Sequence, residues 1–165
     1  MKPRVVDRIR EGLSVADPAG AGTYAANARA YQAGLEALDQ EFQRGLASCA
    51  RRQFVTAHAA FGYLARRYNL EQVPIAGISP DQEPTPARLA ELKAFLQQTG
   101  VRYVFTETLA SPALAQTLAR EVGAQTLVLN PIEGLTSEET ARGETYITVM
   151  RQNLTALRTA LECAS

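Results

Sequence analysis

The chain contains a single histidine, His58, and this residue has the clearest capacity for chemistry. It follows the run 53–57, which predicts a β-strand, and it precedes the run 59–64, which predicts the start of a helix. In an open α/β sheet, ligands bind at the carboxyl ends of the strands. A neutral imidazole is a common metal ligand, but one histidine cannot hold a metal alone, so its neighbours decide its role.

Glu133 is the leading partner for His58. It lies in the loop that follows a predicted strand at 126–129. Because the carboxyl ends of parallel strands meet at one edge of a sheet, we expect the imidazole and this carboxylate to converge there. Both are suitable ligands for zinc or manganese. The alternative for His58, and the commoner case for a lone histidine, is that it caps the following helix and binds no metal.

Two further glutamates follow other predicted strands and are candidates for a supporting role. Glu107 directly follows the run 103–106 and is a candidate to orient the imidazole without binding the metal itself. Glu83 lies in the loop 78–84, just before a predicted helix. That position favours a simple electrostatic interaction between Glu83 and the positive end of the helix.

Motifs for enzymatic catalysis are missing from the sequence. No predicted strand is followed by a glycine-rich phosphate loop, and no Gly-x-Ser-x-Gly turn is present. Cys49 and His58 lie at opposite ends of one predicted strand, which is too far apart for a nucleophile and its base. We therefore expect a binding protein and no enzyme. A rival interpretation is a stand-alone α/β module that binds a small organic anion, or acts as an enzyme, at the same edge.

The elements that must position these residues alternate between strands and helices. A short helix is predicted over 5–13, and a long helix of roughly 26 residues starts near residue 23. Four helices follow the long one, and strands precede or separate them. The predicted strands are 54–57, 73–77, 102–106 and 126–129. Such alternation predicts an α/β fold with a four-stranded parallel sheet flanked by helices and preceded by the long helix. We expect a helical segment, 1–50, and an α/β lobe, 51–165.

The composition is that of an ordinary globular protein of 165 residues, with 46% hydrophobic residues. Seventeen basic and 17 acidic residues balance, which gives no support for a nucleic-acid or anionic-membrane partner. No signal peptide is visible, so the chain as written is expected to stay in the compartment where it is made. Cys49 and Cys163 fit no metal or haem motif. They are either two separate buried thiols or a disulfide, and a disulfide requires an oxidising compartment.

Several motifs resemble the C-terminal half of the zinc- and manganese-binding solute receptors of ABC importers. Those around the strands are Phe54 to Leu64 with Arg67-Tyr68, Gly77 to Pro80 with Glu83-Pro84, Val104 to Glu107, and Leu129 to Leu135. Tyr146, Met150, Asn153 and Leu154 match near the C-terminus. Asp17-Pro18, Tyr24, Asn27 and Tyr31 resemble the run that leads into the helix between the two lobes of these receptors.

The resemblance implies two α/β lobes, joined by one long helix, with the metal held between them. In the family, two histidines of the N-terminal lobe and two residues of the C-terminal lobe bind the metal. His58 and Glu133 match the two C-terminal positions. A histidine at the first position favours zinc over manganese, so Zn²⁺ is the expected ligand and Mn²⁺ the alternative.

The chain departs from this pattern because it lacks the N-terminal lobe and its histidines. We expect a truncated receptor lobe whose parent lies outside the cytoplasm, in the periplasm or anchored to the membrane. The implied partners are the metal ion and the permease of the importer. A homodimer through the exposed long helix is a further possibility, and a folded fragment without binding activity is the remaining alternative.

Overall fold

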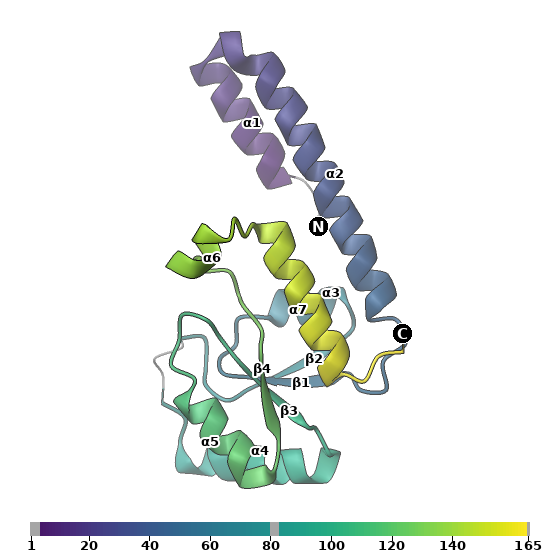
Figure 1. The fold of residues 1–165 in the computed structure, drawn as a ribbon, viewed down its shortest axis with the longest axis vertical. Helices are drawn as coiled ribbons and strands as arrows, with labels where there is room; N and C mark the ends of the chain where they lie inside the picture. Colours follow the sequence, from purple (N-terminus) through teal and green to yellow (C-terminus); the bar gives the residue numbers. More distant parts are fainter. Residues whose placement is uncertain (1–3, 80–82, 165) are drawn as a thin grey trace. The chain divides into compact units, whose positions relative to one another are not determined.

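The computed structural model describes residues 4–79 and 83–164. The chain divides into two compact units, Met1–Gln43 and Arg44–Ser165. In the first unit, helix α1 (Arg4–Ala16) and the short 3₁₀ turn η1 (Pro18–Gly20) precede α2 (Ala21–Gly45) (Figure 1). The 25 residues of α2 confirm the predicted long helix. No helix in the described ranges has both the length and the apolar character needed to cross a membrane.

The second unit is built on a parallel sheet of four strands in the order β2-β1-β3-β4. This arrangement confirms the predicted fold class. The sheet places β1 between β2 and β3, with Val55 opposite Val73 on one side and Val104 on the other. Residues that follow β1 therefore lie beside those that follow β3. The strands are β1 (Gln53–Thr56), β2 (Glu71–Pro74), β3 (Tyr103–Thr106) and β4 (Gln125–Val128).

Helices cover both faces of the sheet. In Figure 1, α4 (Pro86–Thr99) and α5 (Ala113–Val122) lie on one face, and α3 (Gly62–Arg67) and α7 (Tyr146–Ala160) lie on the other. Because successive strand residues alternate between faces, Val55 and Val104 pack against α4 and α5, with Leu92, Leu96 and Leu118 in the same core cluster. The rings of Phe54 and Phe105 pack edge to face, with 6.2 Å between their centroids.

The predicted helix ends are also present. Gly100 and Gly123 terminate α4 and α5 with φ of 63° and 70°, in the left-handed region that glycine adopts without strain. Thr136 and Glu139 form the expected reciprocal capping box at the start of α6 (Ser137–Ala141). These helix ends could be predicted from the sequence because each depends on contacts within a few residues.

Two predicted boundaries around His58 were wrong. The strand predicted at 73–77 begins earlier, at Glu71, because an edge strand tolerates polar residues that interrupt an apolar pattern. The helix predicted from residue 59 begins only at Gly62. Residues 57–59 form a bend instead, in which the Ala59 amide donates to the Gly77 carbonyl. An apolar run has the same pattern in a bend as in the first turn of a helix.

Cys49 and Cys163 are joined by a disulfide, which decides between the two alternatives left open by the sequence. The two residues also pair as an isolated antiparallel bridge. Backbone hydrogen bonds on either side, from Ala164 to Ser48 and from Arg51 to Leu161, continue this pairing. The disulfide thus ties the end of the chain to the segment that leads into β1.

Candidate metal site

His58 lies directly beyond β1, and its side chain is only 2% exposed. Its carbonyl oxygen accepts two hydrogen bonds, from the Thr56 hydroxyl at 2.8 Å and from the Gln72 side-chain amide at 2.8 Å. These bonds hold the bend that turns the imidazole away from the strand. The structure excludes the capping role, because α3 begins four residues later, after Phe61, without any side-chain cap.

Glu107 lies directly beyond β3 and meets His58 because β1 and β3 are neighbours. Its Oε1 lies 2.5 Å from Nδ1 of His58, and both side chains are buried. Burial raises the pKa of the Glu107 carboxyl above its ordinary value, while the hydrogen bond with His58 acts in the opposite direction. When Nδ1 carries the proton and donates it to this carboxylate, the lone pair of Nε2 is left for a ligand.

Glu133 lies in the loop after β4, and its carboxylate approaches the other ring nitrogen of His58. Oε1 of Glu133 lies 3.7 Å from Nε2, and this side chain is 58% exposed. The separation is too long for a hydrogen bond. Two atoms that each lie about 2.0–2.2 Å from one tetrahedral zinc ion are roughly 3.3–3.6 Å apart. The two side chains are therefore spaced, within a few tenths of an ångström, like two ligands of one ion.

The structure does not connect Glu83 with this cluster. Glu83 is exposed and lies two residues before the Thr85 cap of α4. Among the hydrogen bonds and ion pairs of the described residues, none joins Glu83 to His58 or Glu133. Within residues 4–79 and 83–164, no three histidine, cysteine or acidic side chains are placed to hold a metal ion together. The site consists of two potential ligands and one supporting carboxylate.

A small cavity of about 40 Å³ adjoins the site between the segments that follow β3 and β4. Such a volume suits a single water molecule or ion. Thr108, one of the lining residues, has a buried hydroxyl without a hydrogen-bond partner in the structure. The residues that line the cavity are Glu107, Thr108, Leu109, Ala110, Asn130, Pro131 and Glu133.

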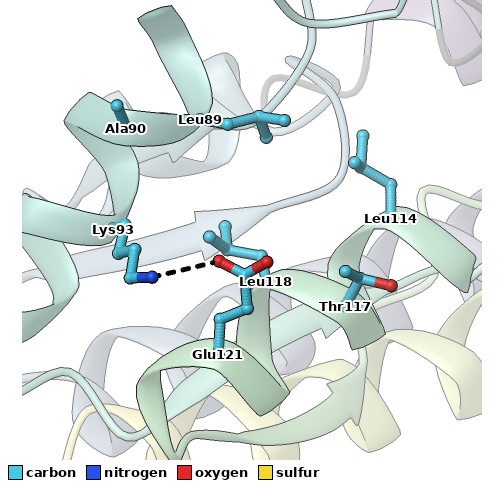
Figure 2. Close-up of a pocket in the computed structure, with 7 residues that line it drawn as sticks. All are labelled: Leu89, Ala90, Lys93, Leu114, Thr117, Leu118 and Glu121. Carbon is cyan, nitrogen blue, oxygen red and sulfur yellow. Dashed lines mark hydrogen bonds and ion pairs between the residues drawn. The ribbon is translucent and has the colours of Figure 1, made fainter. Parts of the chain in front are cut away.

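A larger cavity lies elsewhere, in a groove between α4 and α5. Its volume is about 260 Å³, and Leu89, Leu114 and Leu118 supply its apolar wall. Figure 2 shows the Lys93 ammonium and the Glu121 carboxylate facing each other at this groove, 3.4 Å apart. None of the predicted site residues lines it. The groove is a feature of the helical layer and not of the sheet edge that bears His58.

Gln72 is a supporting residue that the sequence analysis missed. Besides the His58 carbonyl, its side-chain amide nitrogen donates to the Thr56 hydroxyl, and its amide oxygen accepts a hydrogen bond from the Phe61 backbone. A glutamine between a charged residue and a valine on an edge strand gives no local signal of this role. Only the pairing of β2 with β1 brings Gln72 next to the bend at His58.

A parallel sheet with His58, Glu107 and Glu133 at its carboxyl edge has the architecture of an α/β lobe that binds ligands at that edge. Residues 3–160 match the family described as "Zinc-uptake complex component A periplasmic", and the chain belongs to this family. The zinc-binding lipoprotein AdcA of Streptococcus pneumoniae serotype 4 is 48% identical over 155 residues, which cover 94% of this chain and 31% of that protein. The high-affinity zinc uptake system protein ZnuA of Bacillus subtilis is 46% identical over 94% of this chain and 49% of its own length.

A solved structure agrees with these sequence matches. The Zn(II)-bound ZnuA-like domain of Streptococcus pneumoniae AdcA superposes with a TM-score of 0.81 and 46% identity, over 97% of this chain and 60% of that domain. The chain thus spans about a third to a half of the two relatives above. Both relatives carry names of zinc-binding or zinc-uptake proteins.

Proposed function

We propose that this chain is the C-terminal lobe of the zinc receptor of an ABC importer, and that His58 and Glu133 bind zinc. The observation that carries the proposal is the arrangement at His58. Its Nδ1 is held by the buried Glu107, and its Nε2 faces Glu133 across 3.7 Å. A histidine that donates one ring nitrogen to a carboxylate and offers the other to a metal is a recurrent zinc-ligand arrangement.

Zinc is favoured over manganese by the donors and by their spacing. One imidazole and one carboxylate suit zinc, whereas manganese sites favour oxygen ligands. Neighbouring ligands of an octahedral ion with similar bond lengths are only about 3 Å apart. The 3.7 Å separation is nearer to the tetrahedral value. Manganese remains the alternative that a competition titration tests.

The lobe supplies two protein ligands, while zinc sites have three or four. In this proposal, the other ligands come from a second lobe of the parent protein. The present chain would then consist of a helical segment, 1–50, which contains α2, and the α/β lobe, 51–165. The chain alone is therefore expected to bind zinc more weakly than an intact receptor. A permease outside this chain would accept the metal from the parent.

An extracytoplasmic location of the parent agrees with two observations. The family description and the name of the pneumococcal relative specify a periplasmic protein and a lipoprotein. The Cys49–Cys163 disulfide requires an oxidising compartment to persist.

The exposed apolar residues Val5, Ile9 and Leu13 of α1 support self-association of the isolated chain, which its mass in solution would reveal.

Isothermal titration of the metal-free chain with Zn²⁺ tests the proposal. Binding by the unaltered chain that is lost in His58→Ala and weakened in Glu133→Ala is expected. Glu83→Ala is the matched control, because Glu83 is an exposed glutamate that contacts neither residue, and it should bind like the unaltered chain. Circular dichroism confirms that each variant is folded. Zinc binding that persists unchanged in folded His58→Ala would refute the assignment.

A further inference from the structure

Two buried asparagines join the loop of Glu133 to helix α7. The backbone amide of Asn130, directly after β4, donates to Oδ1 of Asn153 at 2.8 Å. In return, Nδ2 of Asn153 donates to the Asn130 carbonyl at 2.7 Å. Asn130 is 4% exposed and Asn153 is 2% exposed. Both polar groups of the Asn130 backbone are therefore satisfied by one side chain from a helix 23 residues away.

The Asn130 side chain continues this network into the loop itself. Its Oδ1 accepts a hydrogen bond from the Ile132 amide at 2.7 Å, and its Nδ2 donates to Oε1 of Glu139 at 3.2 Å. The second oxygen of Glu139 accepts from the Thr136 amide at 2.7 Å. The loop is thus tied at Asn130 before Glu133 and at Thr136 after it, through buried or partly buried bonds.

Ile132 is the residue that needs this support. Its φ is 62°, in the left-handed region that a β-branched side chain rarely adopts. Such a conformation persists only where surrounding contacts impose it. The bond from the Ile132 amide to Asn130 is one such contact, and it sets the direction in which the chain enters Glu133. Without it, the loop would relax toward ordinary backbone angles and the Glu133 carboxylate would leave its position near His58.

Asn153 occupies a place on α7 where an apolar residue would be expected. Val149 and Leu157, four residues before and after it, are buried and lie on the same face of the helix. A polar side chain in such a row is costly unless its hydrogen bonds are made. Its two short hydrogen bonds both go to the Asn130 backbone, and Nδ2 also makes a longer contact, of 3.7 Å, with Sδ of Met150 on α7.

We propose that Asn153 and Asn130 are positioning residues for zinc, which hold the Glu133 carboxylate at the distance from His58 that one ion requires. This inference rests on the proposed function. It predicts that Asn153 affects zinc affinity through Glu133 alone. Residues that orient a metal ligand in this way typically change affinity by about 10- to 100-fold when they are removed.

A double-mutant cycle tests the inference, with zinc binding followed by NMR shifts of the His58 ring so that weak binding is measurable. Asn153→Ala should weaken binding about 10- to 100-fold in the unaltered chain. In a Glu133→Ala background the same substitution should have no further effect, because the carboxylate that it positions is gone. Gln152→Ala, the neighbouring substitution on the exposed side of α7, is the matched control and should leave binding unchanged.

Asn130→Ala provides a second variant if Asn153→Ala does not fold, because it leaves α7 intact and removes the bond to the Ile132 amide. It should show the same dependence on Glu133, together with faster hydrogen exchange at Ile132 in the metal-free protein. An equal loss of affinity in both backgrounds, or no loss in either, would overturn the positioning role while zinc binding itself stands. Absence of zinc binding by the unaltered chain would instead overturn the proposed function, and this inference with it.

Discussion

Nδ1 of His58 lies 2.5 Å from Oε1 of Glu107, and both side chains are buried beside each other at the ends of neighbouring strands. The contact determines the orientation of the imidazole. Nδ1 contacts the Glu107 carboxylate, and Nε2 faces Glu133 on the other side of the ring. The pair thus gives His58 a defined direction, and an ionised Glu107 favours the tautomer with the proton on Nδ1, which is the form that the proposed metal ligand requires.

Glu107→Gln should weaken zinc binding by about 10- to 100-fold, because a neutral amide oxygen is a weaker acceptor for the Nδ1 proton than a carboxylate and orients the imidazole less firmly. A zinc titration of the folded variant measures the change. Glu83→Gln makes the same substitution at an exposed site and should not alter affinity. Unchanged binding by Glu107→Gln would show that the buried carboxylate does not support the ligand.

Gln72→Leu should lower both the zinc affinity and the free energy of unfolding. The substitution removes the bonds to the His58 carbonyl and the Thr56 hydroxyl, and leaves the Phe61 amide without its acceptor. Loss of such partly buried bonds costs about 1–3 kcal/mol, which urea unfolding would measure. Gln125→Leu is a matched control, since Gln125 is exposed on β4, the opposite edge strand. A Gln72→Leu variant as stable as the control would contradict this role.

Removal of the disulfide should destabilise the chain by about 2–5 kcal/mol, because the bond closes a long loop in the unfolded state. The two cysteines are 114 residues apart in the sequence. Urea unfolding of a Cys49→Ala, Cys163→Ala double variant measures the change. A reductant should lower the stability of the unaltered chain to that of the double variant and should leave the double variant unaffected. Stability that does not respond to either treatment would be the contrary result.

The stability of the chain should fall in acid partly through Glu162. Hydrogen bonds from Arg102 and Arg51 hold the pKa of the Glu162 carboxyl below its ordinary value near 4.5. A group whose pKa is lower in the folded state than in the unfolded state stabilises the fold above the unfolded value. That contribution is lost as the pH falls through the lowered pKa.

Urea unfolding of Glu162→Gln at neutral pH and at an acid pH below the lowered Glu162 pKa tests this expectation. The variant should be less stable than the unaltered chain at neutral pH, and the two should converge in acid as Glu162 is protonated. Glu121→Gln removes an exposed carboxylate from the Lys93 ion pair and is the control for loss of a surface charge. An equal difference between Glu162→Gln and the unaltered chain at both pH values would exclude a contribution from this pKa.

Several features of the fold follow from the sequence because they depend on near neighbours. The long helix, the glycine ends of α4 and α5 and the capping box at Thr136 arise from periodicity and short-range hydrogen bonds. The presence of His58, Glu107 and Glu133 at one edge also follows, since parallel strands end on the same side. Their roles as ligands and support stay predictions that the titrations test.

Tertiary structure decided which of these residues meet. The order of strands in a sheet cannot be read from the periodicity of each strand. In this sheet β3 lies beside β1, and for this reason Glu107 and not Glu83 contacts His58. The same pairing of distant segments brought Gln72 to the bend at His58 and Asn153 to the loop of Glu133. It also brought Cys163 to Cys49. The amino-acid sequence determined which groups reach the edge of the sheet, and long-range packing decided the hydrogen bonds that orient them.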